Sequence, residues 1–422
     1  MYLWGILLVI WGIPHLKSCF EGFPPYTDET LLTCSIFSIF FMMLYIFARL
    51  IHNQGKYKKK IFYNYTPTYD NKSAMFMFII LVVFSAIRIY QMGKNSGGLL
   101  EATWSANLDV AAGQEMDLFG QIYGKTSYFL SGVFLIFMVN GKRNLALISF
   151  AVLLVAALVS RARADLLPLL VCVMTYYLFF KKKVNPFLGL LKLGVLAFLA
   201  VYMVFALQMY RWAGSFNDFI DGFSFREFNE LVITMMNSDE GETGLGQYFY
   251  FFVQNNNNFP AFGRAHSYIR MLLFWLPTSW SLGLKPDDFA MAMGAAVGMD
   301  KGGTMHPTLF GDCWANLGFL GIFLGYFWGW GVSMMDRFIT KVDDRFRLPI
   351  YMTIASSLTL IGRGSVYNGF TFMIYICIFI YIIQSIKKKP ALRYEESNAS
   401  VRNTSGSNQD VPSGERVPKT SK

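Results

Sequence analysis

The stretch that decides the fold begins RWAGSFNDFIDGFSFREFNE at residues 211–230 and ends GGTMHP at residues 302–307. It is the one long polar interval in a chain that otherwise alternates apolar runs with short connections. Apolar runs of roughly 17–22 residues have the length that crosses the hydrocarbon core of a bilayer. The sequence therefore predicts a bundle of membrane-spanning helices with one large loop, residues 211–307, on one face.

The composition excludes a soluble globular protein. Of the 422 residues, 54% are hydrophobic and only 15% are charged, and the mean hydropathy is +0.38, whereas soluble domains carry about a quarter charged residues. The net charge of +10 lies in short clusters beside apolar runs, as topology signals do, so we predict no nucleic-acid partner. The five cysteines show no paired spacing, which predicts neither a disulfide framework nor a metal site.

The apolar runs predict an all-α polytopic membrane protein in residues 1–389. The first run lacks a basic leader and a cleavage site, so we expect a retained helix. The last residues, 390–422, are polar and predict a disordered tail. We place about ten spans, near residues 1–13, 31–51, 73–92, 126–141, 144–160, 166–180, 186–210, 309–333, 349–361 and 367–386.

Basic clusters orient these spans. The clusters fall on one side under strict alternation, at residues 56–60, 142–143, 181–183, 337–347 and 387–389. The positive-inside rule then places both termini in the cytoplasm and the loop 211–307 on the periplasmic face. Segment 268–284 has an apolar core of only six residues, 271–276, before Pro277. We therefore interpret it as interfacial or re-entrant, not as a span.

Two patterns have a packing interpretation. Gly321, Gly325 and Gly329, with Gly318 one turn earlier, form a stripe on a single predicted helix, which favours close approach of a neighbouring helix. The aromatic run at 248–252 offers stacking surfaces for sugars, and the alternative is packing within the loop.

Cations on the predicted outer side are the first candidate site. Arg161 and Arg163 stand in a tight turn with Asp165, where two arginines run against the positive-inside bias. Burying a guanidinium in a membrane costs at least about 2.5–3.5 kcal/mol, so such a group is paired or functional. Two interpretations stay open, an anion site at the lipid surface or an ion pair at the interface.

More outer cations share this predicted depth: Arg211, Arg264, His266, Arg270 and Arg363. Arginines recognise phosphate through two parallel hydrogen bonds, so several of them suit a diphosphate. The alternative for each is an anchor at the interface.

Three residues are candidates for proton transfer: His306, Asp165 and Asp312. Near pH 7 a histidine can act as a general base toward a hydroxyl, and Asp312 follows His306 about one turn into the next helix. A packing role is the alternative for each. No residue pattern has metal-ligand or Ser-His-Asp spacing, so we predict no metal and no cofactor.

Three motifs and the layout resemble a known family. The motifs are Ser160-Arg161-Ala-Arg163-Ala-Asp165, Arg211 followed by ten residues and Gly222, and Gly311-Asp312-Cys-Trp-Ala-Asn316-Leu-Gly318-Phe-Leu-Gly321. Together with the large outer loop, they resemble the Wzy-type O-antigen polymerases of bacterial envelopes. The chain departs from the pattern at Arg264, because Trp275 stands where a second glycine would.

This resemblance implies a membrane glycosyltransferase of the GT-C type in the bacterial inner membrane. Its substrate would be an undecaprenyl-pyrophosphate-linked oligosaccharide, polymerised on the periplasmic face during lipopolysaccharide biosynthesis. It implies no cofactor, since the phosphoester already holds the energy, and a chain-length regulator as a possible partner.

Two other functions compete. An O-antigen ligase would use the same donor and have a similar layout. A flippase for the same lipid-linked oligosaccharide would carry internal repeats and only short loops, whereas this sequence has one loop of nearly a hundred residues and no repeat.

Overall fold

The computed structural model describes residues 2–22, 25–52, 71–95, 113, 116–160, 166, 170, 173, 186–213, 216–237, 245–257, 264–296, 306–342 and 344–385. Of the described residues, 85% are helical, and no strand occurs among them. The turn at 161–165, most of the predicted helix 166–180 and the tail 390–422 lie outside them.

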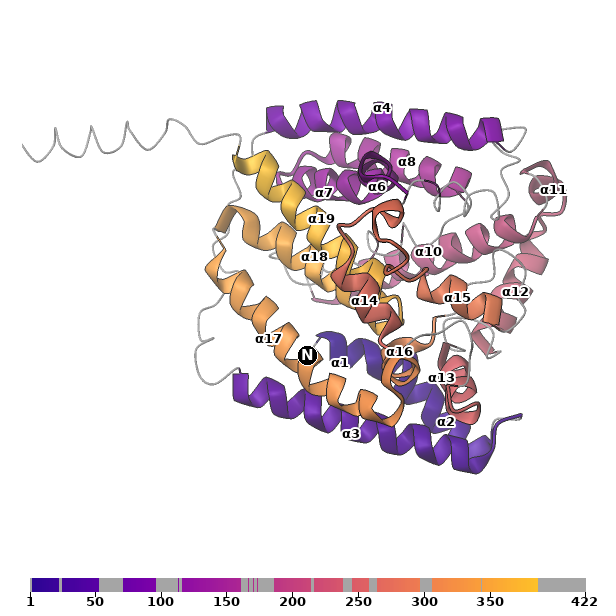
Figure 1. Ribbon diagram of the computed structural model, residues 1–422. Helices are drawn as coiled ribbons and strands as arrows, with labels where there is room; N and C mark the ends of the chain where they lie inside the picture. The colour runs from indigo at the N-terminus through magenta and orange to yellow at the C-terminus, as the bar shows by residue number, and fades with distance from the viewer. Residues whose placement is uncertain are drawn as a thin grey trace, which may run out of the picture.

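The helices, in chain order, are α1 (Tyr2–Leu7), η1 (Leu8–Gly12), α2 (Ile13–Glu21), α3 (Asp28–His52), α4 (Asn71–Asn95), α6 (Leu118–Gly124), α7 (Thr126–Val139), α8 (Arg143–Ser160), α10 (Pro186–Trp212), α11 (Phe216–Asp221), α12 (Phe225–Asn237), α13 (Leu245–Gln254), α14 (His266–Leu272), η4 (Thr278–Trp280), α15 (Phe289–Ala296), α16 (Thr308–Leu317), η5 (Gly318–Phe323), α17 (Leu324–Lys341), α18 (Asp344–Gly362) and α19 (Val366–Ser385). Figure 1 shows α3 and α17 on one side of the molecule, α4, α7 and α8 on the other, and α18 and α19 between them.

Several of these helices are long and apolar enough to cross a membrane. Six of them qualify among the described residues, and a seventh does if the pair α6 and α7, bent by 46°, is one span. The chain is therefore a multi-pass α-helical membrane protein. The prediction of ten spans and of cytoplasmic termini stays a prediction.

The helix pairs show which ends lie together. α3 runs parallel to α17, since Arg49 forms an ion pair of 2.6 Å with Asp336 near the end of both helices. α7 runs parallel to α19, because the rings of Tyr128 and Phe372 meet at 5.1 Å near the start of both. α18 begins where α17 ends and stops where α19 begins.

Two ends of the bundle follow from these pairings. The site end holds the starts of α7, α16 and α19 and the end of α18, where the Thr308 amide donates to the Arg363 carbonyl at 3.2 Å. The basic end holds the Lys142–Arg143 turn and Lys341 in the last turn of α17. The separation agrees with the predicted alternation for these helices.

The glycine stripe packs as predicted, but on a helix that is not continuous. A Cβ on Gly325 would collide with the Phe41 carbonyl of α3, and one on Gly329 with the Tyr45 carbonyl. The predicted span 309–333 lies within the candidate span Thr308–Lys341, but its helix is not continuous, because Gly318 at φ +58° ends α16. A 3-10 segment, η5, then leads into α17. Asp312 and the glycines that pack against α3 therefore lie on separate helical segments.

The first helix is also longer than predicted. It was predicted near residues 1–13, yet helix continues to Glu21. A π-helical turn, Leu8–Gly12, precedes α2, and Pro14 lies in the first turn of α2, where its missing N–H group removes no hydrogen bond. A Cβ on Gly362 would lie 2.8 Å from Ile6, so this helix begins beside the end of α18.

The predicted loop 211–307 contains helices of its own, and one of them is built into the bundle. Phe249 and Phe252 of α13 are fully buried, and the Phe249 ring lies 5.0 Å from Trp11. His15 Nδ1 shares a 2.7 Å hydrogen bond with the Tyr250 hydroxyl. These aromatics therefore pack, and the alternative of a sugar-stacking surface is wrong for the buried ones.

The segment 268–284 does not form a span. α14 ends at Leu272 and is followed by turns and the three-residue η4. Neither is long enough to cross a bilayer, which agrees with that part of the prediction.

Candidate functional site

A network of hydrogen bonds joins α14 to α16 at the site end. Asp312 is 1% exposed, and its Oδ2 accepts a 2.8 Å hydrogen bond from the Ser267 hydroxyl. Asn316, one turn after Asp312, accepts from the Ser267 amide at 2.8 Å and donates to the Ser267 hydroxyl at 3.2 Å. A buried carboxylate requires such partners, so the network fixes α14 against α16.

The start of α16 is held in an unusual backbone conformation. Thr308 has φ +62°, which a residue other than glycine rarely adopts. Its amide bonds to the Arg363 carbonyl, and a Cβ on Gly364 (φ +98°) would lie 2.7 Å from the Thr308 nitrogen. Only glycine fits there. The close approach brings the backbone at His306 and Pro307 to the turn that carries Arg363.

Arg270 connects α14 to the start of α19. Its guanidinium carbon lies 4.4 Å above the centre of the Tyr367 ring, and its Nη1 donates to the Pro286 carbonyl at 2.5 Å. The side chain is 4% exposed. Stacking on an aromatic face holds the cation in place while it keeps its charge.

His266, at the start of α14, faces the segment that precedes α15. Its Nε2 lies 2.8 Å from the Asp287 carbonyl, and a carbonyl only accepts, so Nε2 carries the proton in this tautomer. Burial lowers the pKa of His266 below its ordinary value of 6.5. The imidazole is therefore neutral at pH 7.

Arg363 lies in the turn between α18 and α19 and is 7% exposed. Its charge acts on the phenol of Tyr248 in α13: burial raises the Tyr248 pKa, and Arg363 opposes that rise. Arg363 is thus a cation close to α13, one of the helices within residues 211–307.

The structure brings together half of the predicted site residues. We call His266, Arg270, His306, Asp312 and Arg363 the junction cluster, since they lie on α14, on the start of α16 and on the turn after α18. All five are buried except His306, which is half-buried.

The other predicted residues are either exposed at the edge of this cluster or have side chains that are not described. Arg264 is exposed in the turn before α14. Arg211 lies in the last turn of α10, and its side chain is not described. Arg161, Arg163 and Asp165 lie outside the described residues.

Sequence reasoning missed the polar partners of the cluster. Ser267 and Tyr367 carry no signal of their own in the sequence. Asn316 stands four residues after Asp312 on a helix, and that spacing puts both side chains on one face. Lys285 is also buried, at 5% exposed, and its Nζ donates to the Leu276 carbonyl at 2.9 Å.

The junction cluster offers two buried guanidiniums, a half-buried imidazole and a fixed carboxylate within one end of a membrane bundle. Such a set can bind an anionic group and accept a proton from a hydroxyl. No family model matches the sequence, and no curated protein and no solved structure matches it either.

Proposed function

We propose that this chain is a GT-C-type membrane glycosyltransferase that polymerises oligosaccharide repeat units linked to undecaprenyl pyrophosphate. The site would face the periplasm from the bacterial inner membrane, and the product would be O-antigen or a similar surface polysaccharide. One observation carries the proposal. The junction cluster gathers two arginines, two histidines and an aspartate at the end of the bundle opposite Lys142–Arg143 and Lys341, and the positive-inside rule assigns those basic residues to the cytoplasm.

The proposed reaction needs stabilisation of a leaving diphosphate. The acceptor hydroxyl oxygen attacks the anomeric carbon of the growing chain, and the carbon–oxygen bond to the diphosphate breaks with its electron pair on the diphosphate. Arg270 and Arg363 are nearly covered, so they act on this charge from beneath the surface, where the effective dielectric constant is low. The exposed Arg264 is the direct contact.

The proton of the acceptor hydroxyl needs a base that substrate can reach. His306 is half-buried, whereas Asp312 is covered and bonded to Ser267 and Asn316. We therefore assign the base to His306. Asp312 is the positioning residue, since it holds α14 and the first turns of α16 together.

The test is polymerisation by the purified protein in vesicles supplied with synthetic lipid-linked repeat units. We expect His306→Gln to lower the rate by about a hundredfold or more, the range for loss of a general base. Arg363→Gln should lower it by a similar factor, since it removes charge stabilisation of the leaving group. Arg226→Gln is the matched control, because Arg226 is exposed in α12 and pairs with Glu230 at 3.0 Å. It should leave the rate unchanged.

The competing functions give different products in the same vesicles. Transfer of glycan only to added lipid A-core would identify a ligase. Movement of the lipid-linked unit across the bilayer without glycosidic bond formation would identify a flippase. Unchanged polymer with both His306→Gln and Arg363→Gln would show that the junction cluster is not the site.

A further inference from the structure

A second cationic site lies inside a membrane-spanning helix, away from the junction cluster. Arg88 belongs to α4, within the candidate span Lys72–Lys94. It stands seven residues before Asn95, the last residue of α4, which is about 10 Å at the rise of an α-helix. An ionisable residue at such a depth is costly and marks a functional site unless it is paired.

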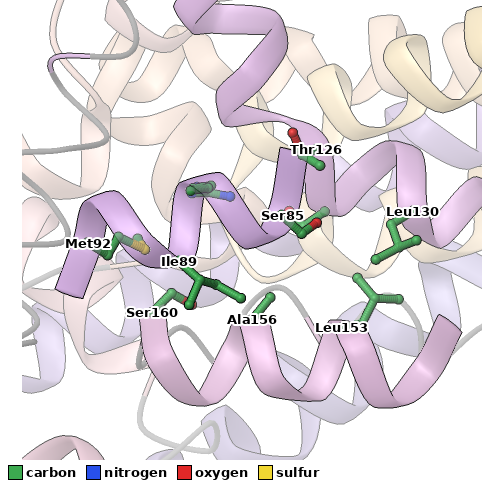
Figure 2. Close-up of a pocket in the computed structure, with 10 residues that line it drawn as sticks. Ser85, Ile89, Met92, Thr126, Leu130, Leu153, Ala156 and Ser160 are labelled. Atoms are coloured by element: carbon green, nitrogen blue, oxygen red, sulfur yellow. The ribbon is translucent and has the colours of Figure 1, made fainter. Parts of the chain in front are cut away.

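Arg88 lines a hollow between three helices. Ser85 precedes it by three residues on the same face of α4, Thr126 and Ser127 come from the start of α7, and Ser160 ends α8. Figure 2 shows Ser85, Thr126 and Ser160 around one space, closed by Leu130 and Leu153. The innermost part of the hollow holds a group the size of one water molecule.

The donors in this hollow lack an acceptor. Arg88 Nε is buried and has no hydrogen-bond partner among the described residues, and no described carboxylate forms an ion pair with Arg88. Beside the hollow, which Tyr123 does not line, the Tyr123 hydroxyl of α6 is also buried without a hydrogen-bond partner in this part of the chain. The Thr126 hydroxyl already donates to the Tyr123 carbonyl at 2.5 Å. What the site lacks is an anionic acceptor.

The depth of the hollow selects the kind of anion. It lies at the site end, since the start of α7 and the end of α8 form it, and the long side chain of Arg88 can span most of the distance from its backbone to the phosphate groups of membrane lipids. One phosphate oxygen fills a space the size of a water molecule, while the rest of the headgroup stays at the mouth. Arg donates to phosphate through its fork of N–H groups, and a hydroxyl beside it adds a further donor.

We propose that the hollow between α4, α7 and α8 binds the phosphate group of a membrane lipid, with Arg88 as the cationic donor and Tyr123 as a second donor. The proposal does not depend on the proposed enzymatic function. Two lipids share the required chemistry, a phospholipid and a polyprenyl phosphate, and the experiment separates them.

The experiment is native mass spectrometry of the purified full chain with phosphatidylglycerol, with undecaprenyl phosphate, and with a neutral glycosyl diacylglycerol. Arg88→Gln should lower the affinity for the phosphate lipids about tenfold, the effect of one lost charge-assisted hydrogen bond. Tyr123→Phe should lower it less, and the neutral lipid should bind all proteins alike.

Lys94→Gln is the matched control, because Lys94 is an exposed cation in the last turn of the same helix. It removes the same charge at the same end and should leave affinity within about twofold, since an exposed charge contributes little. Displacement of phosphatidylglycerol by a trace of undecaprenyl phosphate would assign the hollow to the polyprenyl lipid, and equal competition would assign it to bulk phospholipid.

Equal retention of phosphate lipids by Arg88→Gln and the unaltered protein would overturn the proposal. An equal loss of affinity with Lys94→Gln would also overturn it, because general attraction to anionic lipid would then explain the binding. Thermal unfolding of Arg88→Gln in phosphate-free detergent separates a folding defect from lost binding, and Arg88→Lys should restore part of the affinity.

Discussion

At the scale of single residues, the junction cluster is held by groups whose role is to position other groups. Asp312 is covered by protein, and its partners Ser267 and Asn316 come from two helices. A buried carboxylate that loses a partner keeps its desolvation penalty. The stability of the cluster therefore depends on Ser267, a serine that the sequence alone does not distinguish.

Ser267→Ala tests that weight. We expect a loss of about 1–3 kcal/mol in the free energy of unfolding, because Asp312 Oδ2 would be left without its donor. Thermal unfolding in detergent measures it. Ser357→Ala is the control, since Ser357 is equally buried but donates only within α18, to the Thr353 carbonyl at 2.9 Å. Equal losses in the two variants would contradict the role of Ser267.

His266 predicts a dependence of stability on pH. Burial lowers its pKa below 6.5, so the unfolded chain binds more protons than the folded chain in the window below 6.5. Its contribution to stability is complete above that value and is lost as the pH falls toward the lower folded-state pKa. We expect His266→Gln to flatten this part of the stability profile, measured as unfolding temperature against pH. A profile that keeps its full slope in His266→Gln would contradict this assignment.

At the scale of elements, α3 and α17 pack backbone to backbone. The stripe Gly321, Gly325 and Gly329 faces α3 or the end of α16, with no room for a methyl group. Close approach of this kind replaces the missing hydrophobic drive between helices in lipid. The contact sets the position of α17 against α3. The Gly318 turn and η5 then join α17 to α16.

Gly325→Ala should separate α17 from α3. The added Cβ meets backbone, which cannot rotate away, so we expect a loss of about 1–3 kcal/mol, as for an overpacked core. Gly331→Ala on the same helix has open space around its Cβ, and it should be neutral or stabilise by up to about 1 kcal/mol through helix propensity. Thermal unfolding compares the two. A Gly325→Ala protein as stable as Gly331→Ala would show that the helices do not touch there.

The elements also show what the sequence could predict. Helices 28–52, 71–95, 143–160 and 366–385 lie within a few residues of the predicted ranges, because long apolar runs and flanking charges mark their ends. The break at Gly318 was missed, since a glycine within an apolar run looks the same in a continuous helix and at a C-cap. The continuation of the first helix past Ile13 to Glu21 was also missed, because the π turn before Pro14 makes its missing N–H harmless.

The candidate site was predictable only in part. Charged and titratable residues, such as Arg270, Arg363 and Asp312, are easily recognised in an apolar sequence. Their neighbours across space do not, because the Ser267–Asp312 and Arg270–Tyr367 contacts join residues far apart in the sequence. Arg88 was overlooked because the sequence shows only one charge inside an apolar run. That its buried Nε has no described acceptor is visible only in three dimensions.

At the scale of the whole molecule, the bundle has two chemically distinct ends. Lys142–Arg143 and Lys341 lie at one end, and the junction cluster and the Arg88 hollow lie at the other. The order of the elements supports this separation where the turns are short, at α7 to α8, α17 to α18 and α18 to α19, which lie at alternate ends of the bundle (Figure 1).

The orientation in the membrane can be measured directly. In a chain with Cys19 replaced by serine, we expect a membrane-impermeant maleimide to label Arg226→Cys in intact spheroplasts. Lys142→Cys should react only after the membrane is permeabilised, because the positive-inside rule assigns its turn to the cytoplasm. Both side chains are exposed in the folded chain. The reverse pattern would invert the protein and move the junction cluster to the cytoplasmic face.

The docking of α13 has a consequence for exchanging parts between proteins. Its Phe249 and Tyr250 rest on Trp11 and His15 of the first helix, which lies more than two hundred residues earlier in the chain. Residues 211–307 are therefore not an independent unit. Expressed alone, they would expose the apolar face of α13 that packs against the first helix. A chimera that transplants this region into another protein has to carry the N-terminal helix with it.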